Sequence, residues 1–267
     1  MPEIENDERM PITAHLEELR KRLLRSVIAI GVTFSLCFNY SEDILRWMML
    51  PLNMTLNVKR AFPFFYATYA ETAIKLTFTE ITEPFWIHMK ISFVAGIFLA
   101  LPYLLLQVWG FISPGLLPKE RRYMLPFIVS ATAMFVTGAL FCQYIVLPMG
   151  VKFLLEYKTE NLVQMIKIDN YTDFVSKFML AFGLIFELPL AIAILSKLGI
   201  VSPAFLSRNR KYAVLIAFIV AALLTPTSDV FNMTLMAMPI LVLYEVGIIL
   251  ARILGKKKDE GAKDISL

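Results

Sequence analysis

Three carboxylates have the positions and surroundings that could do chemistry in this sequence. Glu18 lies in HLEELRKRL before the first long apolar run, Glu120 in QVWGFISPGLLPKERRY between the second and third, and Glu187 inside the fourth, within AFGLIFELPLAIAI. A carboxylate can accept the planar fork of an arginine through two hydrogen bonds, which a lysine does not reproduce. Glu18 and Glu120 are therefore candidates for recognising a basic peptide. The alternative is that they belong to solvated helix ends whose bases only fix topology.

Glu187 is unusual because an ionisable group in the middle of a membrane helix costs about 2.5 to 3.5 kcal/mol on insertion scales. Pro189 follows it closely, removes a backbone donor and predicts a kink. We expect Glu187 to face a polar notch, a partner or the interior of a helix bundle. A protonated Glu187 bonded to a neighbouring helix is the alternative.

Glu245 lies nearer the end of the last run, and we expect it to reach the interface or to pair with Arg252.

Other catalytic or metal-binding patterns are missing from the sequence. It has no glycine-rich phosphate loop, no nucleophile elbow and no HExxH pair. The two histidines, His15 and His88, fall on opposite predicted sides of a membrane, and both cysteines, Cys37 and Cys142, fall inside apolar runs. We therefore expect no enzyme activity, no metal and no cofactor.

The composition is that of a membrane protein. Of the 267 residues, 58% are hydrophobic and only 18% are charged, against roughly 25% charged in a soluble domain. The mean hydropathy is +0.65. The net charge of +4 does not indicate nucleic-acid binding, because the basic residues lie between apolar runs and form no stripe of their own.

Six apolar runs predict an all-α polytopic protein with six transmembrane helices, because a span needs about 20 apolar residues. Leu-Pro pairs at Pro102 and Pro189 predict kinked helices that form a concave face. The fifth and sixth spans are expected to be short, and a re-entrant hairpin is the alternative for the fifth. The runs cover roughly residues 23–40, 85–108, 123–147, 174–195, 212–224 and 231–250.

Lys and Arg residues gather on one side of this six-span arrangement, which predicts that both termini are cytoplasmic. The predicted parts are a cytoplasmic N-terminal segment (1–22), a membrane domain (23–250) with an external loop (41–84), and a cytoplasmic tail (251–267). The external loop is expected to form an ordered cap, and the tail has the composition of a disordered end. The N-terminal residues are acidic and show no cleavable signal.

Four stretches in series carry a family resemblance. They are HLEELRKRL, the run from Pro102 through QVWGFISPGLLPKERR, FELP in the fourth span, and LTPTSDVF after the fifth. In this order they resemble TatC, the multi-spanning receptor subunit of the twin-arginine protein translocase. The chain departs from the family's common pattern at Leu106, at Met233 and in TPTSD, which leaves the geometry of the last hairpin open.

The resemblance implies a receptor that binds signal peptides with paired arginines and exports folded proteins, driven by the proton gradient across the bacterial cytoplasmic (inner) membrane. It assigns Glu18 and Glu120 to twin-arginine recognition, with Arg20, Lys21 and Phe111 in the adjoining motifs.

The same resemblance assigns three further residues and the partners. Glu187 corresponds to an intramembrane position that contacts partners, and Pro51 and Asp229 to functional positions of the external loops. The implied partners are TatA- and TatB-like single-span subunits, together with further copies of this chain in a hetero-oligomeric complex within the lipid bilayer.

Two other classes are considered. A proton-coupled small-molecule transporter would use Glu187 as its carrier residue, but such proteins usually present several polar groups at this depth. An intramembrane enzyme would need a second catalytic residue at the depth of Glu187, and the sequence offers none.

Overall fold

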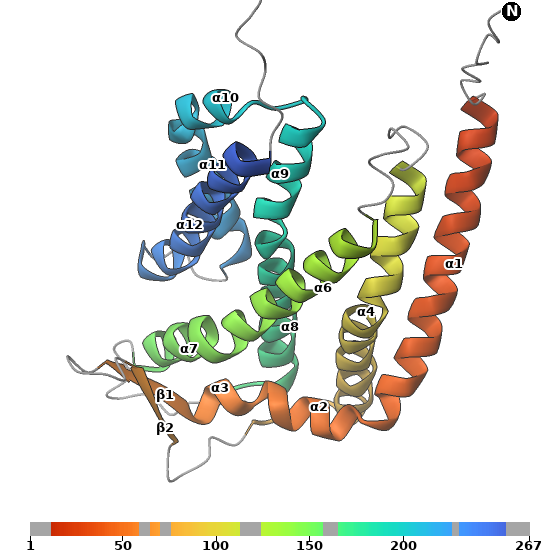
Figure 1. Ribbon diagram of the computed structural model, residues 1–267. Helices are drawn as coiled ribbons and strands as arrows, with labels where there is room; N and C mark the ends of the chain where they lie inside the picture. Colours follow the sequence, from red (N-terminus) through yellow and green to blue (C-terminus); the bar gives the residue numbers. More distant parts are fainter. Residues whose placement is uncertain are drawn as a thin grey trace, which may run out of the picture. The chain divides into compact units, whose positions relative to one another are not determined.

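The computed structural model describes residues 12–58, 65–69, 76–112, 124–156, 165–225 and 230–254. Figure 1 shows the helices and strands of the described residues. Their contacts divide the chain into two compact units. Unit 1 comprises Met1–Ile44 and His88–Thr132, and unit 2 comprises Leu45–Ile87 and Ala133–Leu267.

Five helical stretches in the described part are long and apolar enough to cross a membrane. They coincide with five of the six predicted runs. They are α1 (Ile12–Asn39), α4 (Glu83–Ile112), the continuous α6 (Met124–Phe141), η2 (Cys142–Val146) and α7 (Leu147–Glu156), the pair α8 (Ile168–Phe186) and α9 (Leu188–Lys197), and α12 (Val230–Leu254).

The last two predicted spans differ from each other in length. α11 (Arg210–Leu224) has 15 residues, which rise about 22 Å, less than a hydrocarbon core of about 30 Å. It is short, as predicted, and the six-span count stays a prediction. α12 is longer than predicted, with 25 residues. It continues through Pro239 and past residue 250, because good helix formers such as Ala251 and Arg252 follow the apolar run.

The two Leu-Pro pairs behave differently. α4 continues as one helix through Pro102, whereas the fourth run is interrupted at Glu187, between α8 and α9. Proline therefore interrupts one of the two helices that were expected to kink.

Unit 1 depends on a close crossing of α1 and α4 at Gly96. Thr33 Oγ1 donates a 2.8 Å hydrogen bond to the carbonyl oxygen of Gly96. A Cβ at position 96 would lie 2.9 Å from the backbone nitrogen of Phe34. Lipid supplies no hydrophobic drive for helix association, so small residues that let backbones approach are what hold such a crossing.

Unit 2 uses glycines in the same way. A Cβ on Gly138 of α6 would lie 2.5 Å from the carbonyl oxygen of Phe182 on α8, and a Cβ on Gly183 of α8 would lie 2.6 Å from the Phe135 ring on α6. Gly247 of α12 faces Ile192 of α9. Each glycine therefore receives a larger residue of the facing helix, which lets α6 approach α8 and lets α9 approach α12.

A segment that we name the cap follows α1. It consists of α2 (Ser41–Met48), α3 (Leu50–Asn53) and an antiparallel hairpin of β1 (Met54–Val58) and β2 (Phe65–Tyr69), in which Met54 pairs with Tyr69. The short helices agree with the expected ordered cap. The hairpin was not predicted and is an exception to the otherwise helical fold.

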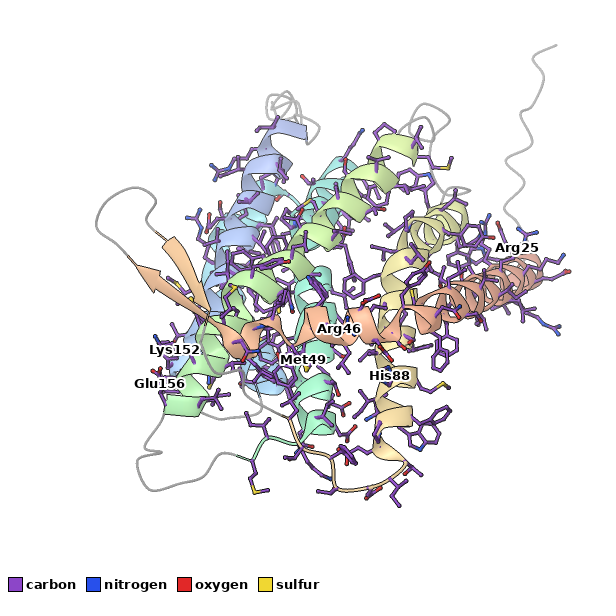
Figure 2. All side chains as sticks on the ribbon, turned by 90° about the horizontal axis from the view of Figure 1, so that it is seen from below. Arg25, Arg46, Met49, His88, Lys152 and Glu156 are labelled. Atoms are coloured by element: carbon purple, nitrogen blue, oxygen red, sulfur yellow. The ribbon has the colours of Figure 1, made fainter. Side chains whose placement is uncertain are left out.

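Two smaller features complete unit 2. α10 (Pro203–Arg208) begins at the N-cap Ser202, whose hydroxyl accepts from the Phe205 amide. On α7, Lys152 and Glu156 lie one turn apart (Figure 2), with 4.0 Å between Nζ and Oε1. Pairs of this i,i+4 kind add little stability at an exposed surface.

Candidate functional site

Glu18 lies on the N-terminal part of α1 and is paired with Arg22 one helical turn later. Arg22 Nε and Nη2 donate to the same oxygen, Glu18 Oε1, at 2.9 and 2.5 Å. The two side chains are 25% and 22% exposed, respectively. Glu18 Oε2 receives no hydrogen bond from any described residue. Glu18 is therefore held in place while one of its oxygens stays open.

Residues at the C-terminal end of α4 lie against this part of α1. The rings of His15 and Phe111 stack with 4.3 Å between centroids and 21° between planes. Gly110 lies against the guanidinium group of Arg22. Trp109 is buried and its ring lies 4.7 Å from that of Phe127 on α6. Phe111 is thus brought next to the segment that carries Glu18, and His15 is part of the same contact.

The basic residues of the first motif remain at the surface. Arg20 is exposed, and Lys21 is exposed and pairs with Glu17 at 2.8 Å. Glu120, the second predicted carboxylate, lies outside the described residues, and so does Asp229. The structure thus brings together Glu18 and Phe111 and leaves the position of Glu120 relative to them as a prediction.

Glu187 lies at the interruption between α8 and α9. Pro189 has no N–H to donate to the carbonyl oxygen of Ile185, which ends the regular helical pattern there. The Glu187 amide donates to Leu184 at 3.1 Å, and its carbonyl oxygen accepts from the Ala191 amide at 2.9 Å. Its side-chain Oε1 is buried and has no hydrogen-bond partner within the described part of the chain. This buried carboxyl oxygen therefore lacks the donor that a buried polar atom usually has.

The cap is fixed to unit 2 at Pro51. In an α-helix the amide of residue 51 would donate to the carbonyl oxygen of Trp47, and proline has no such hydrogen. Gln143 Nε2 donates to that oxygen instead, at 2.7 Å. The next carbonyl oxygen, that of Met48, accepts from Tyr171 Oη at 2.8 Å. The break between α2 and α3 is therefore closed by side chains from η2 and α8.

The π-helical segment η2 positions Gln143 for this role. Leu147 donates to the carbonyl oxygen of Cys142 in the wider π pattern, just before Pro148, which has no amide hydrogen. Gln143 is 1% exposed. Its neighbour Tyr144 accepts from Trp47 Nε1 at 3.0 Å. Gln143 and Tyr144 of η2 therefore both contact the end of α2.

A buried carboxylate closes the start of α4 in unit 2. Glu83 is 7% exposed, and its Oε2 accepts from the amides of Thr79 and Glu80 at 2.9 and 3.3 Å. Lys167 Nζ lies 4.0 Å from the same oxygen. Thr77 and residues near Lys167 also exchange backbone hydrogen bonds. Glu83 therefore joins the segment before α4 to the segment before α8.

Glu245 has a different partner from the predicted one. Its carboxylate pairs with Arg210 at the start of α11, with 2.7 Å between Nε and Oε1 and 2.9 Å between Nη2 and Oε2. Arg252, the expected partner, donates to Ser207 Oγ at 2.9 Å. The predicted pairing with Arg252 was wrong because it considered neighbours along one helix, whereas α11 packs beside α12 and supplies the nearer guanidinium.

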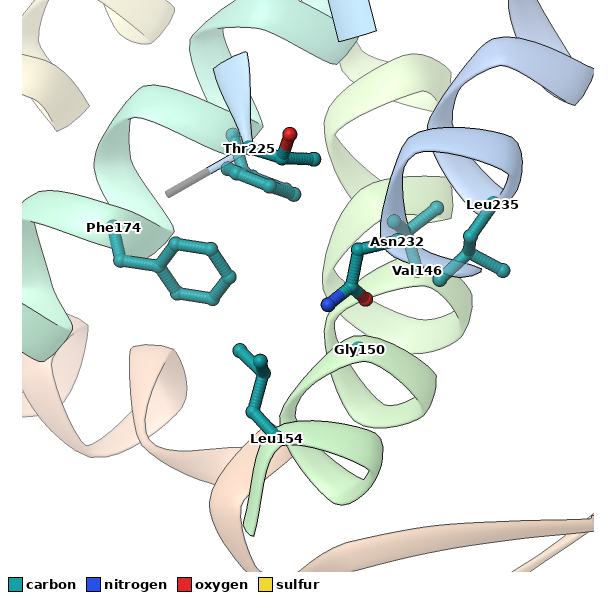
Figure 3. Close-up of a pocket in the computed structure, with 8 residues that line it drawn as sticks. Val146, Gly150, Leu154, Phe174, Thr225, Asn232 and Leu235 are labelled. Carbon is teal, nitrogen blue, oxygen red and sulfur yellow. The ribbon is translucent and has the colours of Figure 1, made fainter. Parts of the chain in front are cut away.

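A small pocket in unit 2 lies between α7, α8 and the ends of α11 and α12 (Figure 3). Its polar members are Thr225 and Asn232, and Thr225 Oγ1 donates back to the carbonyl oxygen of Ala221 at 2.8 Å. The other lining residues are Val146, Gly150, Leu154, Phe174, Phe178 and Leu235. An apolar lining of this kind offers nothing to hold a charged ligand, and the described residues include no cluster suited to a metal ion.

Comparison with known proteins identifies the family. The model of the family described as Sec-independent protein translocase protein (TatC) matches residues 14–239. The chain belongs to the TatC family. The resemblance predicted from the four sequence stretches is confirmed.

Relatives and solved structures agree with this assignment. The Sec-independent protein translocase protein TatC of Desulforapulum autotrophicum is 39% identical over 258 residues, which cover 97% of this chain and 90% of that protein. The TatC protein of Carboxydothermus hydrogenoformans is 38% identical over 257 residues, covering 96% and 99%. A crystal structure of the twin arginine translocase receptor TatC matches with a TM-score of 0.74 and 34% identity, covering 90% of this chain and 99% of that one.

Membership of the TatC family makes the chain a component of a protein translocase and a multi-pass membrane protein. It places the chain among translocase subunits, not enzymes.

Sequence reasoning missed several of the contacts at Glu18 and at the cap. The spacing of Glu18 and Arg22 is that of an i,i+4 ion pair and could have indicated their contact. Gly110, Gln143 and Tyr171 carried no such signal, because their partners lie far away in the sequence.

Proposed function

We propose that this TatC-family chain is the receptor subunit that binds twin-arginine signal peptides at the cytoplasmic face of the bacterial cytoplasmic membrane. The observation that supports the proposal is the carboxylate of Glu18, which is fixed at the contact of α1 and α4 with Oε2 open. An arginine that donates to this oxygen would gain a charge-assisted hydrogen bond.

The other residues of the proposed site have complementary roles. Phe111, stacked on His15, supplies an apolar wall beside the carboxylate. Arg20 and Lys21 are exposed on α1 and set the local charge that a basic peptide meets. Glu120 is proposed as the second carboxylate, which would bind the second arginine.

Peptide titration tests the proposal. A labelled twin-arginine peptide and its twin-lysine counterpart are titrated against the full chain in nanodiscs, with Glu18→Gln, Glu120→Gln and Glu156→Gln as variants. Loss of one charge-assisted hydrogen bond predicts that Glu18→Gln weakens twin-arginine binding roughly 10- to 100-fold. Glu156, an exposed carboxylate that pairs with Lys152 one turn away on α7, is the matched control and should leave the affinity unchanged. Equal binding by parent, Glu18→Gln and Glu120→Gln would refute the assignment.

The proposed topology puts both termini and the site in the cytoplasm and the cap outside, because Lys and Arg accumulate on the cytoplasmic side. The proposed parts are the N-terminal segment 1–22, the membrane domain 23–250 with the external loop 41–84, and the tail 251–267. Cysteine labelling from either side of sealed vesicles tests the arrangement. Labelling of a Tyr66→Cys variant only from the cytoplasmic side would contradict this arrangement.

Export of folded cargo is proposed to need the proton gradient and single-span TatA- and TatB-like subunits, with this chain present in several copies. Glu187 is the proposed intramembrane contact for such a subunit, since an ionisable group inside a membrane helix usually faces a partner, a cavity or the bundle interior. Photocrosslinking from a residue next to Glu187 is expected to capture a single-span subunit in intact membranes. Capture only of other parts of this chain would count against that role.

Pro51 and Asp229 are proposed to act through the shape of the external loops. For Pro51 the reason is physical, because its missing amide hydrogen leaves the Trp47 carbonyl oxygen to Gln143.

Family membership favours protein transport over the small-molecule carrier that Glu187 alone had also allowed.

A further inference from the structure

The guanidinium group of Arg22 fills a notch that exists because residue 110 is glycine. A Cβ at Gly110 would lie 2.6 Å from Arg22 Cζ and 2.8 Å from Nη2, and nearer still to Nη1. These contacts are shorter than atoms tolerate, so any side chain at this position would push the guanidinium away. α4 thus presents a space for a flat group at its C-terminal end.

The carboxylate of Glu18 holds the same guanidinium from α1. Both hydrogen bonds from Arg22 to Glu18 end on Oε1, so the pair does not form the two parallel bonds of which arginine and carboxylate are capable. Glu18 therefore accepts hydrogen bonds from the guanidinium group of Arg22, and Gly110 packs closely against the same group. We name Glu18 and Gly110 the guanidinium seat.

We propose that Arg22 occupies the guanidinium seat only while no peptide is bound, and that an arginine of the visiting peptide takes its place. This inference rests on the proposed function and adds a specificity-determining role for Arg22 and Gly110. The incoming arginine first meets the open Oε2 and then displaces Arg22 from the notch. The number of ion pairs at Glu18 is the same before and after the exchange.

The seat explains a preference for arginine over lysine at one peptide position. A guanidinium is planar and offers five N–H donors, whereas an ammonium is a compact point charge with a larger hydration requirement. A lysine that reached Glu18 would leave the notch at Gly110 unfilled and would not match the contacts that Arg22 gives up. Arg22 thus acts as an internal competitor that a lysine peptide displaces poorly.

The test measures peptide affinity for the full chain in nanodiscs, using labelled twin-arginine and twin-lysine peptides. Arg22→Gln removes the competitor and is expected to tighten twin-arginine binding about twofold, the size expected for losing one i,i+4 ion pair. Gly110→Ala blocks the notch for any guanidinium. It is expected to weaken twin-arginine binding about tenfold and to reduce the difference between the two peptides.

Gly31→Ala is the matched control, since a Cβ at position 31 of α1 meets nothing within 4 Å and should change neither affinity. Thermal unfolding of each variant checks that it is folded, and if Gly110→Ala does not fold, Arg22→Gln decides the question. Unchanged or weaker binding by Arg22→Gln, with Glu18→Gln still strongly impaired, would overturn the exchange and leave the proposed function standing. Undiminished binding by Glu18→Gln would remove both.

Discussion

The cap and the guanidinium seat are both held by polar contacts, but the contacts differ in how far along the chain their partners lie. Gln143 and Tyr171 reach carbonyl oxygens of Trp47 and Met48, 96 and 123 residues away. The central contact at the seat joins Glu18 to Arg22, four residues away on the same helix.

This difference separates contacts that hold the fold, at the cap, from an ion pair that a ligand can exchange, at the guanidinium seat. The Trp47 carbonyl oxygen has no helical donor because of Pro51, and the Met48 carbonyl oxygen has none because the Leu52 amide donates to Met49. Both must find another donor, since a buried unsatisfied group costs about 1 to 3 kcal/mol. A partly exposed pair within one helix contributes much less. The cap contacts therefore serve stability, whereas the pair at the seat can open for a ligand at little cost.

Gln143→Met tests the fixed side of the comparison and should have the largest effect. The substitution keeps the length and apolar packing of the side chain but leaves the Trp47 carbonyl oxygen without its donor. Because Gln143 is 1% exposed, water does not replace the lost bond. We expect a loss of about 2 kcal/mol in unfolding free energy, measured by reversible unfolding in detergent.

Pro51→Ala supplies the control for this prediction. Alanine restores an amide at position 51 that can donate to the Trp47 carbonyl oxygen, so Gln143→Met should be less damaging in that background. Additive losses in the double variant would show that Gln143 stabilises the protein by some other contact.

Tyr171→Phe is expected to have an intermediate effect. It removes the hydroxyl that donates to the Met48 carbonyl oxygen at 2.8 Å while keeping the buried ring, so we expect a loss of about 1 kcal/mol. Tyr144→Phe is the matched control, since that hydroxyl accepts from Trp47 Nε1 at an exposed position. A larger loss for Tyr144→Phe than for Tyr171→Phe would contradict the role given to Tyr171.

Apolar length and proline placement in the sequence predicted most of the helices. Runs near 20 residues are strong signals because lipid demands satisfied backbone groups. α11 was predicted to be short from its 13-residue run, and the break at Glu187 followed from Pro189. The hairpin of β1 and β2 was missed although β1, with the sequence MTLNV, alternates apolar and polar residues, because a five-residue run is a short signal and β2, with the sequence FYATY, does not repeat the alternation.

The candidate site was predictable only where its residues lie close together in the sequence or match the family. Glu18 and Phe111 came from motifs, and the structure adds their surroundings. Gly110 gave no signal, since a glycine near a helix end usually indicates only a helix terminus, and its notch depends on Arg22 of another helix. Gln143 could not be assigned to Trp47 because contacts between distant segments are set by packing.

Arg22→Gln and Glu18→Gln test the exchangeable side and should have the smallest effect on stability. Each removes one i,i+4 ion pair whose members are 22% and 25% exposed, so we expect a loss of about 0.5 kcal/mol in unfolding free energy. The same two variants are expected to move peptide affinity in opposite directions. If either variant were as destabilising as Gln143→Met, the ion pair of Glu18 and Arg22 would be needed for the fold. A peptide arginine could then displace Arg22 only at a large cost in stability, which the bonds between the peptide and Glu18 would not offset.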